Sequence, residues 1–328
     1  MASSGERPDL NEYRIVAVVP AYKVEREIGS VLASIPDYVR HIVVVNDNSP
    51  DGTAERVRTE AQRDPRILLV SHEQNKGVGG AMVTGFRKSL ELDAQIVVKI
   101  DGDGQMPLGR IPDLVQPLIE GEADFTKGNR FRDFRALGAM PNVRRVGNAA
   151  LSFLAKAATG YWNCFDPTNG FIALRSDLLR SLPLDGLDKS YFFEISLLSR
   201  AYLHDAVVRD VPIPARYGDE VSNMSVGRVI LSFPPKLLQI LIRRVMLKYF
   251  VYDFSLVSIY LMVGLPLLLF GLVFGGVNWI QFSRLGAPAP TGTIMLATLP
   301  IILGFQLLLS AIGIDIQSVP KNPRGRLA

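Results

Sequence analysis

The sequence predicts an α/β fold, a mostly parallel sheet with helices on both faces, followed by a hairpin of two membrane-spanning helices. Over residues 14–128, short runs rich in valine and isoleucine alternate with amphipathic segments. This alternation is typical of parallel strands joined by crossover helices. Two uncharged stretches, residues 254–277 and 293–314, lie in the last third of the chain. Each is long enough to cross roughly 30 Å of hydrocarbon as a helix.

Composition narrows the class of protein. The 328 residues are 48% hydrophobic and carry a net charge of +4, with a mean hydropathy of +0.19 and a pI near 9.1. A mild basic excess suits nucleic acid, an anionic membrane or phosphorylated substrates. The cations gather near the uncharged stretches rather than on one soluble face, which argues against a nucleic-acid partner. Cys164 is the single cysteine, so no intrachain disulfide is expected, and the polar first 13 residues predict no signal peptide.

The elements of the α/β region follow one another in regular order. Strands are expected at residues 15–19, 41–46, 66–71, 95–100 and 123–127, because these runs are short, apolar and β-branched. Helices are expected between them at residues 25–34, 53–61, 79–91 and 110–120. The carboxyl ends of parallel strands meet at one edge of a sheet, where open α/β sheets bind ligands.

The strand at 95–100 ends in the most informative motif of the chain. Asp101 and Asp103 follow it, separated by Gly102, and Gln105 comes next after a second glycine. Two carboxylates and an amide oxygen form a hard oxygen cluster suited to Mg²⁺ or Mn²⁺, which also holds substrate phosphates. The alternative is a polar turn that caps the next helix.

Three further loops reach the same predicted edge. They are Pro20-Ala21-Tyr22-Lys23-Val24-Glu25, Asp47-Asn48-Ser49-Pro50-Asp51-Gly52-Thr53 and Asn75-Lys76-Gly77-Val78-Gly79-Gly80-Ala81. Each has a plainer explanation, such as a turn, a helix cap or a core aromatic. Four polar loops at one edge nevertheless predict a ligand site. A dinucleotide fingerprint is not expected, since the first loop has no glycine and Met82 breaks the pattern in the third; no P-loop motif occurs.

These four loops carry a family resemblance. The motifs P-A-Y-x-x-E, D-x-S-x-D-G-T, N-x-G-x-G-x-A and D-x-D-x-Q, in this order, resemble those of inverting glycosyltransferases of family 2, which have the GT-A fold. Within that family the chain is similar to polyisoprenyl-phosphate glycosyltransferases, a group that includes dolichol-phosphate mannose synthases. One position departs from the pattern: Asn46 stands where the family often has an aspartate.

The resemblance implies a role for each loop. It implies that Pro20, Ala21, Tyr22 and Glu25 cradle the nucleoside, that Asp47 accepts a hydrogen bond from the base, and that Lys76 and Gly77 lie near the ribose and phosphates. Asp101 would face the nucleotide and, with Asp103 and Gln105, hold the metal.

The acceptor half is expected in residues 124–220. Arg130, Arg144 and Arg145 are interpreted as the cations that bind the acceptor phosphate, with surface charge as the alternative. Asp166 lies in a loop, and Glu194 in a helix, that resemble the family's acceptor side. Asp166 is the first candidate for orienting the acceptor or taking a proton, and Glu194 is its rival. Residues 212–222 are interpreted as a loop that closes over the site.

The last third predicts membrane attachment. The expected division is a GT-A domain at 1–227, juxtamembrane amphipathic helices at 228–252 and a hairpin with its tail at 253–328. Lysines and arginines flank the spans on the side of the termini, and Arg284 is the one cation between the spans. The positive-inside rule therefore places the catalytic domain and both termini in the cytoplasm, on an inner or plasma membrane.

Together these features predict a metal-dependent hexosyltransferase with a lipid acceptor. The expected reaction moves a hexose from a nucleotide-diphosphate sugar to undecaprenyl or dolichyl phosphate for cell-envelope glycan or glycoconjugate synthesis. A UDP-sugar is favoured as donor, GDP-mannose is possible, and family resemblance suggests a homo-oligomer, a tetramer. The alternatives are transfer to an already glycosylated lipid and a non-catalytic membrane scaffold.

Overall fold

A computed structural model describes residues 8–130, 142–214 and 226–327, without the side chains of 142–146, 148 and 226–231. The chain forms two compact units. Unit 1 contains residues up to Leu241 together with the tail from Pro320, and unit 2 runs from Ile242 to Val319.

Unit 1 is built on one seven-stranded sheet of order β3-β2-β1-β4-β6-β5-β7. Only β6 is antiparallel to its neighbours, β4 and β5; the other pairs are parallel. The strands are β1 (Ile15–Ala21), β2 (Val39–Asn46), β3 (Ile67–Ser71), β4 (Ile96–Lys99), β5 (Phe125–Asn129), β6 (Ile172–Arg175) and β7 (Val208–Pro212). The predicted, mostly parallel α/β sheet is confirmed.

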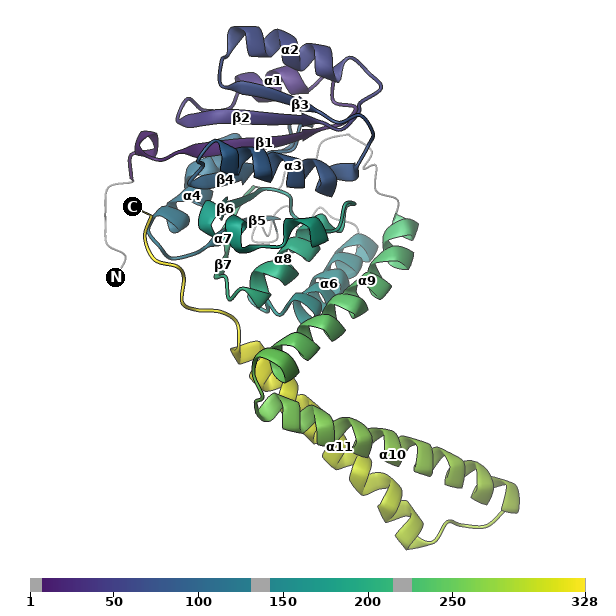
Figure 1. Cartoon of the computed structure of the whole chain (residues 1–328). Helices are drawn as coiled ribbons and strands as arrows, with labels where there is room; N and C mark the ends of the chain where they lie inside the picture. Colours follow the sequence, from purple (N-terminus) through teal and green to yellow (C-terminus); the bar gives the residue numbers. More distant parts are fainter. Residues whose placement is uncertain (1–7, 131–141, 215–225, 328) are drawn as a thin grey trace. The chain divides into compact units, whose positions relative to one another are not determined.

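Helices cover both faces of the sheet (Figure 1). In chain order the helices before the hairpin are α1 (Ile28–Ala33), α2 (Thr53–Arg63), α3 (Gly77–Glu91), α4 (Ile111–Ile119), α6 (Asn142–Thr159), α7 (Ser176–Ser181), α8 (Phe193–Leu203) and α9 (Val226–Met246). Of these, α9 packs, in the part that the structure describes, against α6 and α8 and not on the sheet. The main core joins one face of the strands to α1, α2 and α4. On the other face α3 packs closely on β1, since a Cβ at Gly85 would lie 2.2 Å from Val18 Cγ1.

Two lysine side chains lie on this second face of the sheet, because successive side chains of a strand point to opposite faces. Lys99 of β4 and Lys127 of β5 both pair with Ile172 of the strand between them. Residues in register point to the same face of a sheet. Both lysines are therefore buried on the face of the sheet that packs against α8. Lys99 is the last residue of β4, and Lys127 lies two residues before the end of β5.

Unit 2 is a helical hairpin of α10 (Leu256–Leu285) and α11 (Thr291–Gln317), preceded by a short π-helical segment, Leu247–Tyr252. Both helices are long and apolar enough to cross a membrane. They pack through glycines: a Cβ at Gly271 would lie 2.7 Å from Ile301 Cγ1, and one at Gly304 would lie 2.6 Å from Leu268 N. Small residues of this kind allow close helix packing in lipid.

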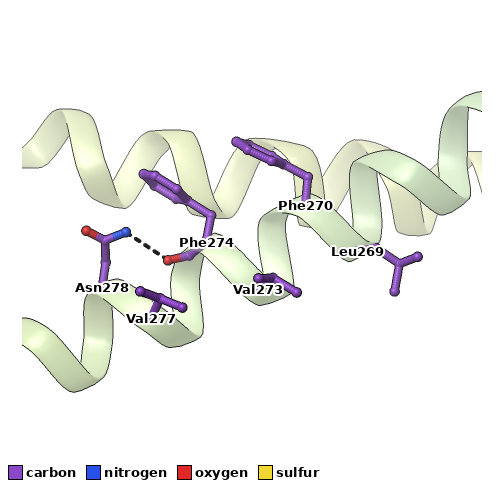
Figure 2. A pocket seen from close by; sticks show the side chains of 6 residues that line it. All are labelled: Leu269, Phe270, Val273, Phe274, Val277 and Asn278. Atoms are coloured by element: carbon purple, nitrogen blue, oxygen red, sulfur yellow. Dashed lines mark hydrogen bonds between the residues drawn. The ribbon is translucent and has the colours of Figure 1, made fainter.

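α10 extends beyond the C-terminal end of its predicted span, and α11 extends beyond both ends of its own. The connection expected at residues 278–292 is much shorter, and Trp279 lies within α10, 79% exposed. A hollow of about 450 Å³ lies on this hairpin. Figure 2 shows the side chains that line it, those of Leu269, Phe270, Val273, Phe274, Val277 and Asn278. Its single polar side chain, Asn278, donates to the Phe274 carbonyl at 2.9 Å. The hollow is part of the apolar surface of the hairpin and not of the strand-end site.

Candidate active site

The loops after β1 and β2 hold one another in place. Glu25 Oε2 accepts a hydrogen bond from Gly52 N at 3.0 Å, and Lys23 N donates to Ser49 Oγ at 2.8 Å. Lys23 adopts a positive φ of 56°, which turns the chain sharply after the strand. Tyr22 is 44% exposed beside this turn. Glu25 is thus held to the second loop, while Tyr22 leaves part of its ring exposed to solvent.

Asp47 connects the second loop to the third. Its carboxylate is 3% exposed, and Oδ1 accepts from Lys76 N at 2.8 Å. The same oxygen lies 2.7 Å from His72 Nδ1, and His72 Nε2 lies 2.9 Å from Thr84 Oγ1 of α3. This network fixes the entry into α3. The base-reading role of Asp47 remains a prediction.

The glycines of the third loop allow a close backbone approach. Gly77 has a positive φ of 78°, and Gly79 N donates to the Lys189 carbonyl at 3.0 Å. A Cβ at Gly79 would lie 2.0 Å from the Asp188 carbonyl oxygen, which leaves no room for a side chain. The third loop therefore lies directly against the segment that leads into α8.

Asp101 and Asp103 occupy the carboxyl end of β4, as predicted. The Asp101 side chain is 34% exposed. Gln105 N donates to Asp103 Oδ1 at 3.1 Å, and this bond shapes the turn. Among the side chains that the structure describes, no three His, Cys, Asp or Glu residues group into an all-protein metal site. Mg²⁺ typically takes one or two carboxylates plus substrate phosphates. The hard oxygen donors of Asp101, Asp103 and Gln105 fit that pattern.

Lys99 connects the aspartate turn to the acceptor half. Its buried Nζ donates to Asp101 Oδ1 at 2.5 Å and lies 3.3 Å from Glu194 Oε1 in the first turn of α8. Burial opposes the charge, but Asp101 and Glu194 outweigh it and raise the pKa of Lys99 to about 12. Glu194 is 7% exposed and is therefore a buried carboxylate, not a surface one.

Asp166 and Arg130 form the second charged pair. Asp166 is fully buried, and Arg130 donates to it through Nε at 2.8 Å and Nη2 at 3.0 Å. Burial opposes the negative charge, but the bonds and charge of Arg130 outweigh it and lower the pKa of Asp166. The Arg130 side chain is 39% exposed. The guanidinium of Arg130 is therefore paired with Asp166, while its side chain is partly exposed to solvent.

A buried lysine supports the loop that contains Asp166. Lys127 Nζ donates to the Asn169 carbonyl. Burial lowers the pKa of Lys127, although several acidic groups surround it. The next residue, Gly170, packs against the aspartate turn: a Cβ there would lie 2.4 Å from Lys99 Nζ and 2.9 Å from Asp101 Oδ2. The structure thus brings the loop at 166–170 and the end of β4 together.

Some predicted residues cannot be placed. Arg144 and Arg145 lie in the first turn of α6, but their side chains are outside the described residues. Most of the predicted closing loop, residues 215–222, is also outside them. Sequence reasoning missed Lys99, Lys127, Gly170 and His72. A lysine inside an apolar strand was the signal available for the first.

Comparison with known proteins identifies the family of the chain. Residues 16–182 match the family described as glycosyl transferase family 2. The chain is 30% identical to a UDP-N-acetylglucosamine–dolichyl-phosphate N-acetylglucosaminyltransferase of Methanococcus voltae, over 71% of this chain and 96% of the relative. It is also 30% identical to an undecaprenyl-phosphate mannosyltransferase of Micrococcus luteus, over 61% of this chain and 82% of the relative.

A solved structure gives the same result for the fold. Mannosyl-3-phosphoglycerate synthase from Rubrobacter xylanophilus superposes with a TM-score of 0.53 at 18% identity, covering 75% of this chain and 79% of that one. At this identity the similarity concerns the fold alone. Unit 1 has the predicted GT-A fold, and the chain belongs to glycosyl transferase family 2.

Proposed function

We propose that this chain transfers a sugar from a nucleotide-diphosphate sugar to a polyprenyl phosphate at a membrane surface. One observation carries the proposal: the aspartate turn after β4 and the Arg130–Asp166 pair after β5 occupy the same edge of one sheet. The first suits a donor diphosphate and the second suits an acceptor phosphate. Two relatives named for dolichyl or undecaprenyl phosphate support the choice of acceptor.

The donor is assigned to the first three loops and the aspartate turn. Pro20, Ala21, Tyr22 and Glu25 would form the nucleoside cradle, and Asp47, Lys76 and Gly77 would complete it. The Methanococcus voltae relative is named for a UDP-sugar, which favours a uridine donor over GDP-mannose.

A divalent ion would be held by Asp101, Asp103 and Gln105. When bound, Mg²⁺ or Mn²⁺ would neutralise the diphosphate leaving group as the glycosidic bond breaks. One oxygen of Asp101 would contribute to this ion site, while the other, Oδ1, accepts a hydrogen bond from Lys99 Nζ at 2.5 Å.

The acceptor needs little activation. A phosphate monoester is largely ionised near neutral pH, since its second pKa is about 6. It can attack the anomeric carbon in line and invert it without a strong base. Asp166, held ionised by Arg130, would orient that cation toward the phosphate, and Glu194 would stay the rival candidate for orienting the acceptor or taking a residual proton.

The hairpin would place this reaction at the membrane. We assign the catalytic unit and both termini to the cytoplasmic side because lysines and arginines flank the spans there. A protease added outside sealed cells should leave an N-terminal tag intact. Cleavage of the tag under those conditions would overturn this orientation.

The direct test is a screen of radiolabelled nucleotide sugars with the membrane-embedded chain and undecaprenyl or dolichyl phosphate. The expected product partitions into organic solvent, carries one sugar, and releases it in mild acid as a glycosyl phosphate does. Label that appears only when an already glycosylated lipid is supplied would overturn the phosphate acceptor. Absence of product with every donor, from a chain that binds none of them, would indicate a scaffold.

A further inference from the structure

Lys99 is a buried charge to which the proposed reaction gives no role beyond holding one oxygen of Asp101. Its side chain is 2% exposed, and its Nζ lies between two carboxylates, Asp101 Oδ1 at 2.5 Å and Glu194 Oε1 at 3.3 Å. Burying an ammonium is costly unless it is paired. Gly170 packs against both Nζ and Asp101 Oδ2, so the ammonium is confined beside the aspartate.

This position has a consequence for metal binding. Asp101 is one of the proposed metal ligands, and Lys99 already neutralises its carboxylate. A divalent ion that approaches Asp101 meets an ammonium a few ångströms away, in surroundings where charges are poorly screened. A nucleoside diphosphate brings several negative charges to the same place, so that attraction of the divalent ion to the diphosphate outweighs its repulsion by the Lys99 ammonium.

We propose that Lys99 is a positioning residue that serves as the resident counter-cation of Asp101, so that the divalent ion binds together with the donor diphosphate and not before it. The inference rests on the proposed metal-dependent function and deepens it. It also explains why a lysine ends a strand whose other residues are all apolar.

The test measures Mn²⁺ binding to the full chain in detergent without nucleotide, by the loss of the free-ion electron paramagnetic resonance signal. Lys99→Met keeps the length of the side chain and removes its charge. The variant should bind Mn²⁺ at least about tenfold more tightly than the wild type, a change of about 1.4 kcal/mol, although the fold is less stable. If Lys99 had only a structural role, Lys99→Met would lower the stability of the fold and leave the Mn²⁺ affinity unchanged.

Lys127→Met is the matched control. Lys127 is buried on the same face, pairs with the same residue of β6, and donates to the Asn169 carbonyl instead of Asp101. Its loss should leave Mn²⁺ affinity at the wild-type value. Equal tightening in both variants, or none in Lys99→Met, would overturn the inference.

A second measurement needs no variant and so does not depend on how Lys99→Met folds. The thermal unfolding midpoint of the wild type is followed with Mn²⁺ alone, UDP alone and both. The inference expects a clear rise only with both ligands. An equal rise with Mn²⁺ alone would overturn the role of Lys99 but leave the metal site standing. Absence of any rise with both ligands would overturn the metal site itself, and this inference with it.

Discussion

Arg130 holds the buried carboxylate of Asp166 with two hydrogen bonds, Nε to Oδ2 at 2.8 Å and Nη2 to Oδ1 at 3.0 Å. A paired geometry of this kind fixes the plane of the guanidinium. The arginine is therefore oriented before an acceptor arrives. A guanidinium whose plane is fixed in this way is better suited to recognise a phosphate than the guanidinium of a solvated surface arginine, which is free to rotate.

Replacing Arg130 by alanine should weaken acceptor binding. Loss of one charge-assisted contact costs about 1.5–3 kcal/mol, or roughly tenfold to a hundredfold in the KM for polyprenyl phosphate. The KM for the nucleotide sugar should stay near the wild-type value. Arg209→Ala is the control, since that arginine forms a surface pair with Glu122. Unchanged acceptor kinetics, or an equal loss in donor affinity, would show that Arg130 is not an acceptor residue.

Asp166→Asn should change how stability depends on pH. Because Arg130 lowers the folded-state pKa of Asp166 below the unfolded value near 3.9, the ion pair stabilises the fold fully above that value. The stabilisation is lost as pH falls through the lowered pKa. The variant should be less stable by about 1–3 kcal/mol at neutral pH.

Denaturant unfolding of both proteins between pH 7 and pH 3 measures this effect. The gap between wild type and variant should be widest at neutral pH and narrow only below about pH 4. A gap that stays constant down to the lowest pH would indicate that the carboxylate charge contributes nothing.

Gly79→Ala tests the close approach of the third loop to the segment before α8. The new methyl would lie 2.0 Å from the Asp188 carbonyl oxygen, so the backbone must shift. Overpacking of this kind costs about 1–3 kcal/mol. We expect weaker nucleotide-sugar binding, measured by calorimetry, and a lower unfolding midpoint. Gly109→Ala is the control, because nothing lies within 4 Å of its added carbon. Equal behaviour of the two variants would mean that the contact has no functional role.

Removal of divalent ions should abolish transfer. Chelation with EDTA is expected to stop product formation, and excess Mg²⁺ or Mn²⁺ should restore it, since the aspartate turn offers hard oxygen ligands. Asp103→Ala should show the same loss with a native circular dichroism spectrum. Full turnover after exhaustive chelation would exclude the metal role.

The strand ends could be predicted because each depends on local sequence. Asp101 follows the run Ile96-Val97-Val98-Lys99-Ile100, in which Lys99 is the one polar residue, and Gly77 follows a polar turn, so local sequence places both at the site edge. The Lys99–Glu194 pair could not be predicted, because its partners lie far apart in sequence and meet only when α8 packs on the sheet. Strands β6 and β7 were also missed, since β6 has no β-branched residue after Ile172 and leads directly into α7, and β7 contains the adjacent charged residues Arg209 and Asp210.

The ends of the hairpin helices could not be predicted from the sequence either. Composition predicted the two helices, but α10 extends past the C-terminal end of its uncharged stretch and α11 past both ends of its own, and Arg284 lies in the last turn of α10. A long cationic side chain can reach the interface from inside a helix, so charge does not mark where a membrane helix ends.

A buried ion pair in unit 2 provides the last prediction. Arg244 Nη1 donates to Asp315 Oδ1 at 2.6 Å and Nη2 to Oδ2 at 3.0 Å, and Tyr249 donates its hydroxyl to the same aspartate at 2.5 Å. Arg244 is 2% exposed. The pair joins the end of α9 to the end of α11 and would fix the register of the hairpin.

Removing one partner should be far more damaging than removing both. Arg244→Met leaves Asp315 buried without its cation, which typically costs about 3–5 kcal/mol. The double variant Arg244→Met, Asp315→Leu replaces the pair by apolar groups and should recover most of that loss, because no charge is left buried. The thermal unfolding midpoint in detergent measures each change. The neighbouring Arg243 is exposed, so Arg243→Met should have little effect. If Arg244→Met is as stable as Arg243→Met, or if the double variant is less stable than the single one, the pair does not hold the hairpin.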